Sequence, residues 1–137
     1  MLKKSFYVWL DIAIFMFFII FAEFLIFSDL LFYWGMFFYM KEIFIGFFVL
    51  TILVSIYFIG YFFNVHNIQI SGMTGYLKLY FSILWRAMIF VIPTVGLIAY
   101  IYHGSIGSRI FTIFVEILAG FPAIYWYMLS KYNRNVK

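Results

Sequence analysis

The chain has 137 residues, of which 68% are hydrophobic and only 10% charged, with a formal net charge of +4. Globular proteins are closer to half apolar and a quarter charged, so the mean hydropathy of +1.11 excludes a soluble domain, a disordered chain and a coiled coil. Cysteine is absent, which excludes a disulfide framework, a thiol nucleophile and an iron–sulfur centre. The positive charges lie mostly at chain ends and in loops, where membrane proteins carry orientation signals, so we do not predict a nucleic-acid partner.

The first apolar segment, 5–28, follows Lys3 and Lys4 and predicts a membrane-spanning helix. About 20 apolar residues cross the hydrocarbon core of a bilayer, whereas the apolar part of a signal peptide has about 7–15 residues and precedes a small-residue cleavage site. We therefore expect an uncleaved span. The next stretch, 29–41, is too apolar for a solvated loop and too short to span. We interpret it as an interfacial segment between the first two spans, with the alternative that it lengthens the neighbouring helices.

Three further spans are predicted, at 42–63, 79–102 and 110–129. The polar stretch 64–78 separates the second span from the third, and its glycines indicate a loop. The third and fourth spans are separated by a short turn. All four spans should be helices, because an open sheet would leave backbone polar groups unpaired in lipid. We thus predict an all-α integral membrane protein with four transmembrane helices that form a single polytopic domain over 1–137.

The distribution of Lys and Arg predicts which side of the membrane the termini face. With four spans, both termini and the 64–78 loop share one side, and that side holds six of the eight basic residues outside the spans. Basic residues favour the cytoplasmic side. We therefore expect both termini in the cytoplasm and the chain in the bacterial cytoplasmic (inner) membrane. Tyr and Trp residues, which prefer the interfaces, cluster near the span ends that this topology predicts.

Four acidic or basic residues lie more than one turn inside the predicted spans, and two of them have opposite charge and similar depth. Each such residue costs about 2.5–3.5 kcal/mol at mid-helix. Asp11 and Arg86 lie ~9 and ~10 Å into helices that start from the cytoplasmic side, at 1.5 Å per residue. We therefore predict an Asp11–Arg86 ion pair within the membrane, which would fix helix packing or register. In the alternative interpretation, Arg86 snorkels to the inner headgroups.

The other two ionisable residues are carboxylic acids near the opposite surface. Glu23 and Glu116 lie ~8 and ~9 Å below it on the same rise per residue, and no basic residue inside a span matches them. Lys41 or Arg109 can reach down to them from the outer edge; otherwise we expect one or both to be protonated, because burial and mutual repulsion disfavour two charged carboxylates. A level carboxylate pair is typical of a proton or cation relay. The alternative is two neutral acids that form hydrogen bonds with neighbouring helices.

Proline and small residues mark places where the predicted helices bend or approach closely. Pro93 in the third span and Pro122 in the fourth each remove a backbone hydrogen bond and predict a kink. A kink can act as a hinge, although proline is also an ordinary residue of membrane helices. The second span carries small residues that allow close helix approach, namely Gly46, Thr51, Ser55 and Gly60.

The sequence contains no motif for catalysis, a metal or a cofactor, and we predict neither an enzyme nor a bound cofactor. His66 and His103 fall on opposite sides of the predicted membrane, so we do not expect a shared metal. We expect a non-enzymatic protein that acts in the lipid bilayer through contacts with other membrane proteins or with itself. Accessory or assembly subunits and immunity or exclusion proteins belong to this class. The alternative is a small oligomeric proton- or cation-coupled transporter that uses Glu23 and Glu116.

Overall fold

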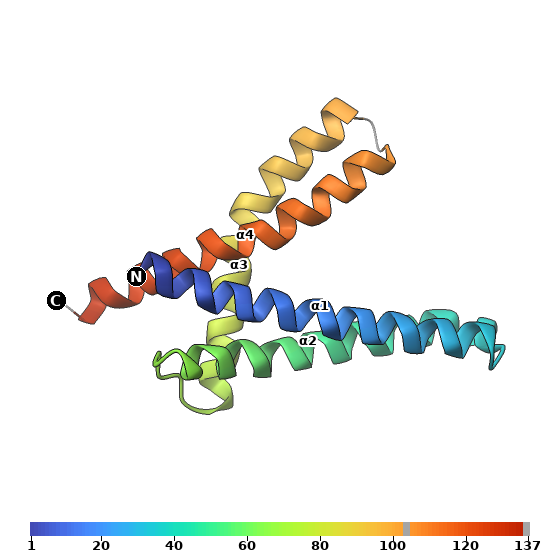
Figure 1. The fold of residues 1–137 in the computed structure, drawn as a ribbon, viewed down its shortest axis with the longest axis horizontal. Coiled ribbons are helices and arrows are strands. Elements are labelled where there is room, and N and C mark those ends of the chain that lie inside the picture. The colour runs from blue at the N-terminus through green and yellow to red at the C-terminus, as the bar shows by residue number, and fades with distance from the viewer. Residues whose placement is uncertain (103–104, 136–137) are drawn as a thin grey trace.

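The computed structural model describes residues 1–102 and 105–135 of the chain. Four long α-helices follow one another, with a short 3₁₀ helix between the first two (Figure 1). These elements are α1 (Leu2–Phe32), η1 (Met36–Tyr39), α2 (Met40–Val65), α3 (Gly72–Tyr102) and α4 (Ile106–Asn135). Each of the four α-helices is long and apolar enough to cross a membrane, by its length and composition. The prediction of four helices of membrane-spanning length and composition is confirmed.

The helices are longer than the predicted spans, and the largest difference is at the start of α3. This helix begins at Gly72, so the second half of the predicted 64–78 loop is helical and that part of the prediction was wrong. The amide group of Asn64 closes the shorter loop, because its Oδ1 accepts from the N–H of Ile70 at 2.7 Å and its Nδ2 donates to the carbonyl of Ile70 at 3.0 Å. Asn67 and Gly72 adopt positive φ values of 60° and 70°. This left-handed conformation helps the chain to reverse direction, and glycine and asparagine adopt it at a lower free-energy cost than most other residues.

The stretch 29–41 is divided between three elements. α1 continues to Phe32 and α2 begins at Met40, so both neighbouring helices are longer than predicted. Between them, Gly35 has a φ of 62° and starts the single turn of η1. The aromatic residues of this connection are exposed, and Phe38 keeps 95% of its surface accessible. The lengthening of the helices therefore accounts for the ends of the stretch, and a short aromatic connection remains in its middle.

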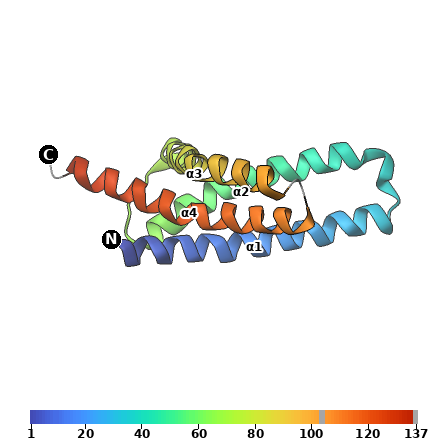
Figure 2. The same cartoon turned by 90° about the horizontal axis from the view of Figure 1, so that it is seen from above.

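The four α-helices form two antiparallel hairpins that join near one end. α1 packs against α2 and α4, and α3 packs against α2 and α4. In Figure 1 the hairpin α1–α2 and the outer halves of α3 and α4 point in different directions, whereas both ends of the chain lie at the shared base. Figure 2 shows the same elongated arrangement from above. The buried core lies in this base and consists of Val8, Phe63, Leu79, Ile83, Ala123, Ile124 and Met128.

Glycines allow the close helix contacts that hold the base together. A Cβ added at Gly60 on α2 would lie 2.6 Å from ring atoms of Tyr76 on α3. At Gly120 on α4, an added Cβ would lie 3.2 Å from Cδ1 of Trp9 on α1. Gly46, by contrast, has open space around it. The small residues of α2 therefore differ in role, and only part of the predicted stripe serves helix packing.

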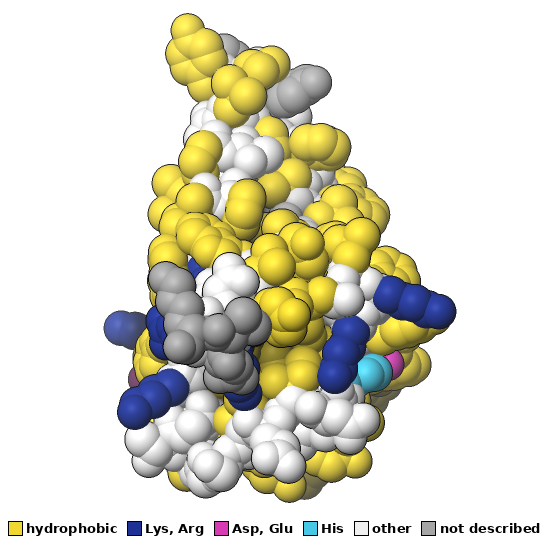
Figure 3. Space-filling view, turned by 90° about the vertical axis from the view of Figure 1, so that its left-hand side faces the viewer, with side chains coloured by type: hydrophobic (Ala, Val, Ile, Leu, Met, Phe, Trp, Pro, Cys, Tyr) yellow, Lys and Arg dark blue, Asp and Glu magenta, His cyan; other side chains and the backbone are white. Residues whose placement is uncertain are grey.

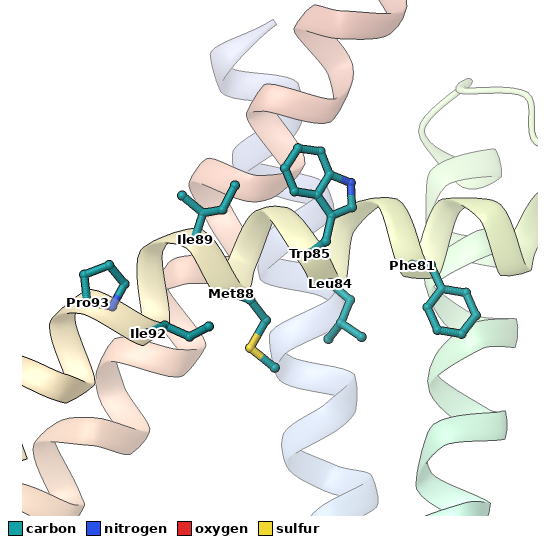
Figure 4. Close-up of a pocket in the computed structure, with 7 residues that line it drawn as sticks. All are labelled: Phe81, Leu84, Trp85, Met88, Ile89, Ile92 and Pro93. Carbon is teal, nitrogen blue, oxygen red and sulfur yellow. The ribbon is translucent and has the colours of Figure 1, made fainter.

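Both prolines lie inside continuous helices. Pro93 is within α3 and Pro122 is within α4. Figure 4 shows α3 changing direction between Trp85 and Pro93, which fits the backbone hydrogen bond that a proline removes. A hinge function at either proline stays a prediction.

Candidate functional site

Asp11 contacts His66, the residue that follows the end of α2. The distance between Asp11 Oδ2 and His66 Nε2 is 2.6 Å. The structure therefore does not form the predicted Asp11–Arg86 ion pair. The physical reason is the chain reversal after α2, which brings the imidazole to the side of α1 that carries Asp11. Both side chains of this pair are partly exposed, 40% for Asp11 and 24% for His66.

Arg86 is buried between α3 and α4, with 7% of its surface exposed. Its Nη1 donates to the carbonyl oxygen of Ser82 at 2.6 Å and to the Ser82 hydroxyl. Three aromatic rings surround the guanidinium carbon, with centroids 4.7 Å (Trp85), 5.5 Å (Trp126) and 5.7 Å (Tyr127) away. Such cation–π contacts stabilise a cation but do not neutralise it. Arg86 is thus held inside the protein by neutral groups, and the predicted pairing with Asp11 is replaced by this aromatic surrounding.

Glu23 on α1 is partly buried and contacts Thr51 on α2. Thr51 Oγ1 lies 2.8 and 2.7 Å from the two carboxyl oxygens of Glu23, and 2.8 Å from the carbonyl oxygen of Phe47. A threonine hydroxyl has one proton to donate and can also accept. Its one proton serves either the Glu23 carboxyl group or the Phe47 carbonyl. Glu23 therefore contacts a hydroxyl group of the neighbouring helix and not a second carboxyl group.

Glu116 on α4 is exposed, and its carboxyl group has no hydrogen-bond or ion-pair partner among the described residues. Its neighbour Ile117 accepts a hydrogen bond from Trp9 Nε1 at 2.9 Å through its backbone carbonyl. Glu116 therefore lies beside the Trp9 turn of α1, whereas Glu23 lies fourteen residues further along that helix, or roughly 21 Å at 1.5 Å per residue. The structure does not form the predicted level pair, because the register of α1 against α4 differs from the one obtained by counting from the span ends.

An apolar cleft of about 370 Å³ lies between the two hairpins. Its lining comes from all four helices, namely Trp9, Ile12, Ala13, Met16, Phe17, Ile20, Ile59, Ile83, Ile113, Ile117, Gly120 and Ile124. We call it the inter-hairpin cleft. Glu116 lies three residues after Ile113 and four before Gly120, a spacing that places neighbours on one side of a helix. The unpaired carboxyl group therefore lies at the border of an apolar cleft.

A second apolar site, with a volume of about 550 Å³, is lined by residues of α3 alone. Figure 4 shows its lining, which is Phe81, Leu84, Trp85, Met88, Ile89, Ile92 and Pro93. We call it the α3 groove. Trp85 belongs both to this groove and to the aromatic surrounding of Arg86. The groove therefore lies beside the buried cation, with the Trp85 ring between them.

Sequence reasoning missed the partners of the predicted residues. The polar pattern places His66 in a loop and indicates Thr51 only as a small residue. The spacing of Tyr127, Ser130, Lys131 and Arg134 places them on one face of a helix, but the charges in this segment were interpreted only as orientation signals. That spacing could have indicated a polar face opposite α3.

Among residues 1–102 and 105–135, no group of three His, Asp or Glu side chains is placed to hold a metal ion. His103 lies outside the described residues. Comparison of the chain with models of protein families, with curated proteins and with solved structures finds no match. The arguments for function therefore rest on the chain's own residues.

Proposed function

We propose that this chain is a non-enzymatic, multi-pass membrane protein that acts through contact with another membrane protein. The observation that carries the proposal is the exposed carboxyl group of Glu116, which has no partner in the described part of the chain and lies next to the exposed apolar residues Ile113 and Ile117 of the same helix. Ionisable groups within spans almost always face protein or water and pair with another group. A partner for Glu116 on another chain would remove the cost of leaving it in lipid.

The partner that fits is a transmembrane helix with a hydrogen-bond donor or a basic residue at the depth of Glu116. Such a helix would pack its apolar side chains against the inter-hairpin cleft, and its polar group would bind the Glu116 carboxyl. Interhelical polar contacts of this kind contribute about 0.6–2 kcal/mol each in membranes. Shape and apolar packing would supply the remainder of the affinity.

Photo-crosslinking from two positions tests this proposal. A photoreactive residue replaces Ile113, which lines the cleft, and in the control it replaces Phe48, which is exposed on α2 and does not line the cleft. After irradiation of intact membranes, the chain is purified in mild detergent and its cross-linked products are identified by mass spectrometry. We expect one defined membrane protein at Ile113 and none at Phe48.

Two substitutions at Glu116 show whether the carboxyl group takes part. Glu116→Gln keeps hydrogen-bonding capacity and should keep the cross-link, whereas Glu116→Leu should lose it. A product with twice the mass of the chain would identify the partner as a second copy. The absence of a defined product at Ile113, or equal yields with Leu and Gln, would contradict the proposal.

The alternative function is a proton- or cation-coupled transporter that uses Glu23 and Glu116. A relay needs both groups on one path, and their separation along α1 and different surroundings give this alternative less support. Proton-driven flux in proteoliposomes, compared between the parent and the Glu23→Gln and Glu116→Gln forms, tests it directly. Flux that both substitutions abolish would favour the transporter over the contact function.

We also propose that the base of the molecule, with both ends of the chain, faces the cytoplasm of a bacterial cell from its inner membrane. The excess of Lys and Arg on this side supports the proposal. Figure 3 looks onto this end and shows Lys and Arg side chains gathered around it, whereas apolar side chains cover the part that projects away.

A further inference from the structure

A polar pocket lies between α3 and α4 at the base of the molecule. Its volume is about 230 Å³, which corresponds to roughly seven waters at ~30 Å³ each and leaves room for a phosphate group. Its lining consists of Ser82, Arg86, Tyr127, Ser130, Lys131 and Arg134. We call it the Arg86 pocket. Three of these six side chains are cationic, and none of the chain's five acidic residues is among them.

The buried guanidinium is the part of this pocket that lacks a counterion. Arg86 is 93% buried, that is, 7% exposed, and its Nε has no hydrogen-bond partner among the described residues. The oxygens of Ser82 and the surrounding aromatic rings are neutral. Burying a charge without a charged partner is costly, and Lys131 and Arg134 add like charge to the same pocket. A bound anion would compensate all three cations at once.

We propose that the Arg86 pocket binds the phosphate group of an anionic membrane lipid. Arginine presents a fork of N–H donors that matches phosphate oxygens, lysine adds a compact positive charge, and hydroxyl groups complete the set of donors. Basic pockets between transmembrane helices are typical binding sites for the headgroups of anionic lipids. The phosphate is therefore the chemistry that the lining residues recognise.

The α3 groove identifies the source of the phosphate as a lipid. It begins beside the Arg86 pocket, because Trp85 lines the groove and its ring lies 4.7 Å from the Arg86 guanidinium carbon. From there it follows α3 as far as Pro93, with an apolar lining throughout (Figure 4). An acyl chain can lie along this groove while the headgroup occupies the pocket. Free phosphate would occupy only the Arg86 pocket and would make no use of the α3 groove.

Lipid binding to the full chain in mild detergent tests the proposal by native mass spectrometry. The probe is phosphatidylglycerol, which is anionic, compared with zwitterionic phosphatidylcholine. The variant Lys131→Gln/Arg134→Gln removes two charges from the partly exposed rim of the pocket, and Lys3→Gln/Lys78→Gln is the matched control, because both of its lysines are exposed and neither lines the pocket. A further variant, Arg86→Gln, tests the buried cation.

We expect the parent to prefer phosphatidylglycerol and the rim variant to lose at least about tenfold in apparent affinity, as the removal of a charge-assisted hydrogen bond predicts. The Lys3→Gln/Lys78→Gln control should bind as the parent does. No preference for the anionic lipid, or an equal loss in the control, would overturn the proposal. The rim variant keeps Arg86 and the core, and besides the two charges it changes only the exposed hydrogen bond from Lys131 Nζ to the carbonyl oxygen of Gln69. Its outcome therefore decides the proposal even if Arg86→Gln fails to fold.

A second measurement distinguishes a lipid from free phosphate. Tryptophan fluorescence of the parent in phosphatidylcholine nanodiscs is followed during titration with sodium phosphate, against sodium chloride at equal ionic strength. Trp85 and Trp126 border the guanidinium and report on the pocket. We expect no saturable response to phosphate alone. A saturable response that the rim variant abolishes, without any preference for phosphatidylglycerol, would assign the pocket to a free anion and overturn the lipid proposal.

Discussion

The indole of Trp9 occupies the space left by the missing side chain of Gly120. Its Nε1 donates to the carbonyl oxygen of Ile117 at 2.9 Å, and a Cβ at Gly120 would lie 3.2 Å from its Cδ1. This contact joins the first helix of the chain to the last. It also fixes the register of α1 against α4, which determines the depth of every polar residue on one helix relative to the other.

Replacement of Trp9 by Phe should destabilise the protein, because the carbonyl of Ile117 loses its indole partner and the ring becomes smaller. The lost hydrogen bond alone should cost about 1 kcal/mol. Trp34→Phe is the control, because Trp34 is 77% exposed. Thermal unfolding in detergent, followed by circular dichroism, measures both. Equal midpoints for the two variants would show that the Trp9 contact does not stabilise the fold.

Replacement of Gly60 by Ala should separate α2 from α3. The added Cβ would lie 2.6 Å from the Tyr76 ring, and overpacking of this kind costs about 1–3 kcal/mol. Gly46→Ala on the same helix meets no atom within 4 Å and should be neutral or stabilising by up to ~1 kcal/mol through helix propensity. The difference in unfolding midpoint between the two variants tests the close approach. A tolerated Gly60→Ala would mean that the helices lie further apart.

Replacement of Thr51 by Val should leave the carboxyl group of Glu23 without its partner, at a cost of about 1–3 kcal/mol. Thr94→Val is the matched control, because the hydroxyl of Thr94 bonds only the carbonyl of Phe90 within its own helix. Glu23→Gln should be tolerated, since the amide keeps groups that can bond the Thr51 hydroxyl. Chemical denaturation in detergent gives the three free energies. A strongly destabilised Glu23→Gln would mean that the contact needs both carboxyl oxygens.

A double-mutant cycle should identify the partner of Asp11. Asp11→Asn and His66→Ala, alone and together, should show a coupling of about 0.2–1 kcal/mol, as polar side-chain pairs at partly exposed sites do. The parallel cycle of Asp11→Asn with Arg86→Lys should be additive, because Arg86 has other partners. Free energies of unfolding for each cycle provide the comparison. Coupling in the second cycle and not in the first would restore the pairing predicted from sequence.

Reporter fusions should show which compartment the base of the molecule faces. A reporter that is active only in the cytoplasm should work when fused at Lys137 and fail when inserted near Gly104, between α3 and α4. The expectation follows from the excess of basic residues near the chain ends. Maleimide labelling of single cysteines in intact cells provides an independent measurement, because the parent chain has no cysteine. The reverse pattern of activity would invert the proposed topology.

Continuous hydrophobicity predicts the four helices well, because each span must bury its backbone polar groups in its own hydrogen bonds. It predicts their ends poorly. The segment from Gly72 to Lys78 is polar enough for a loop, yet it continues α3, since polar residues at a membrane surface can be helical as readily as apolar ones inside it. Two hydrogen bonds between the Asn64 side chain and the Ile70 backbone determine where the loop ends. Hydropathy contains no signal for these bonds.

The polar contacts were harder to predict than the helices. The predicted pairs, Asp11 with Arg86 and Glu23 with Glu116, rest only on the depth of each residue counted from the end of its span. Depth gives neither the rotation of a helix about its axis nor its register against a neighbouring helix. The structure gives Asp11 the imidazole of His66 and gives Glu23 the hydroxyl of Thr51. Both partners in the structure are residues to which hydropathy assigns no special role.

The core lies at one end of the molecule. The free energy of local opening should therefore be higher at this end than elsewhere. In α1 the buried residues are Ser5 and Val8 near its start and Leu31 near its end, so the long middle of this helix carries only half-buried and exposed side chains. Segments with few buried contacts open at lower free energy than the core. Backbone amides at the base should therefore exchange their protons more slowly than those of the two arms.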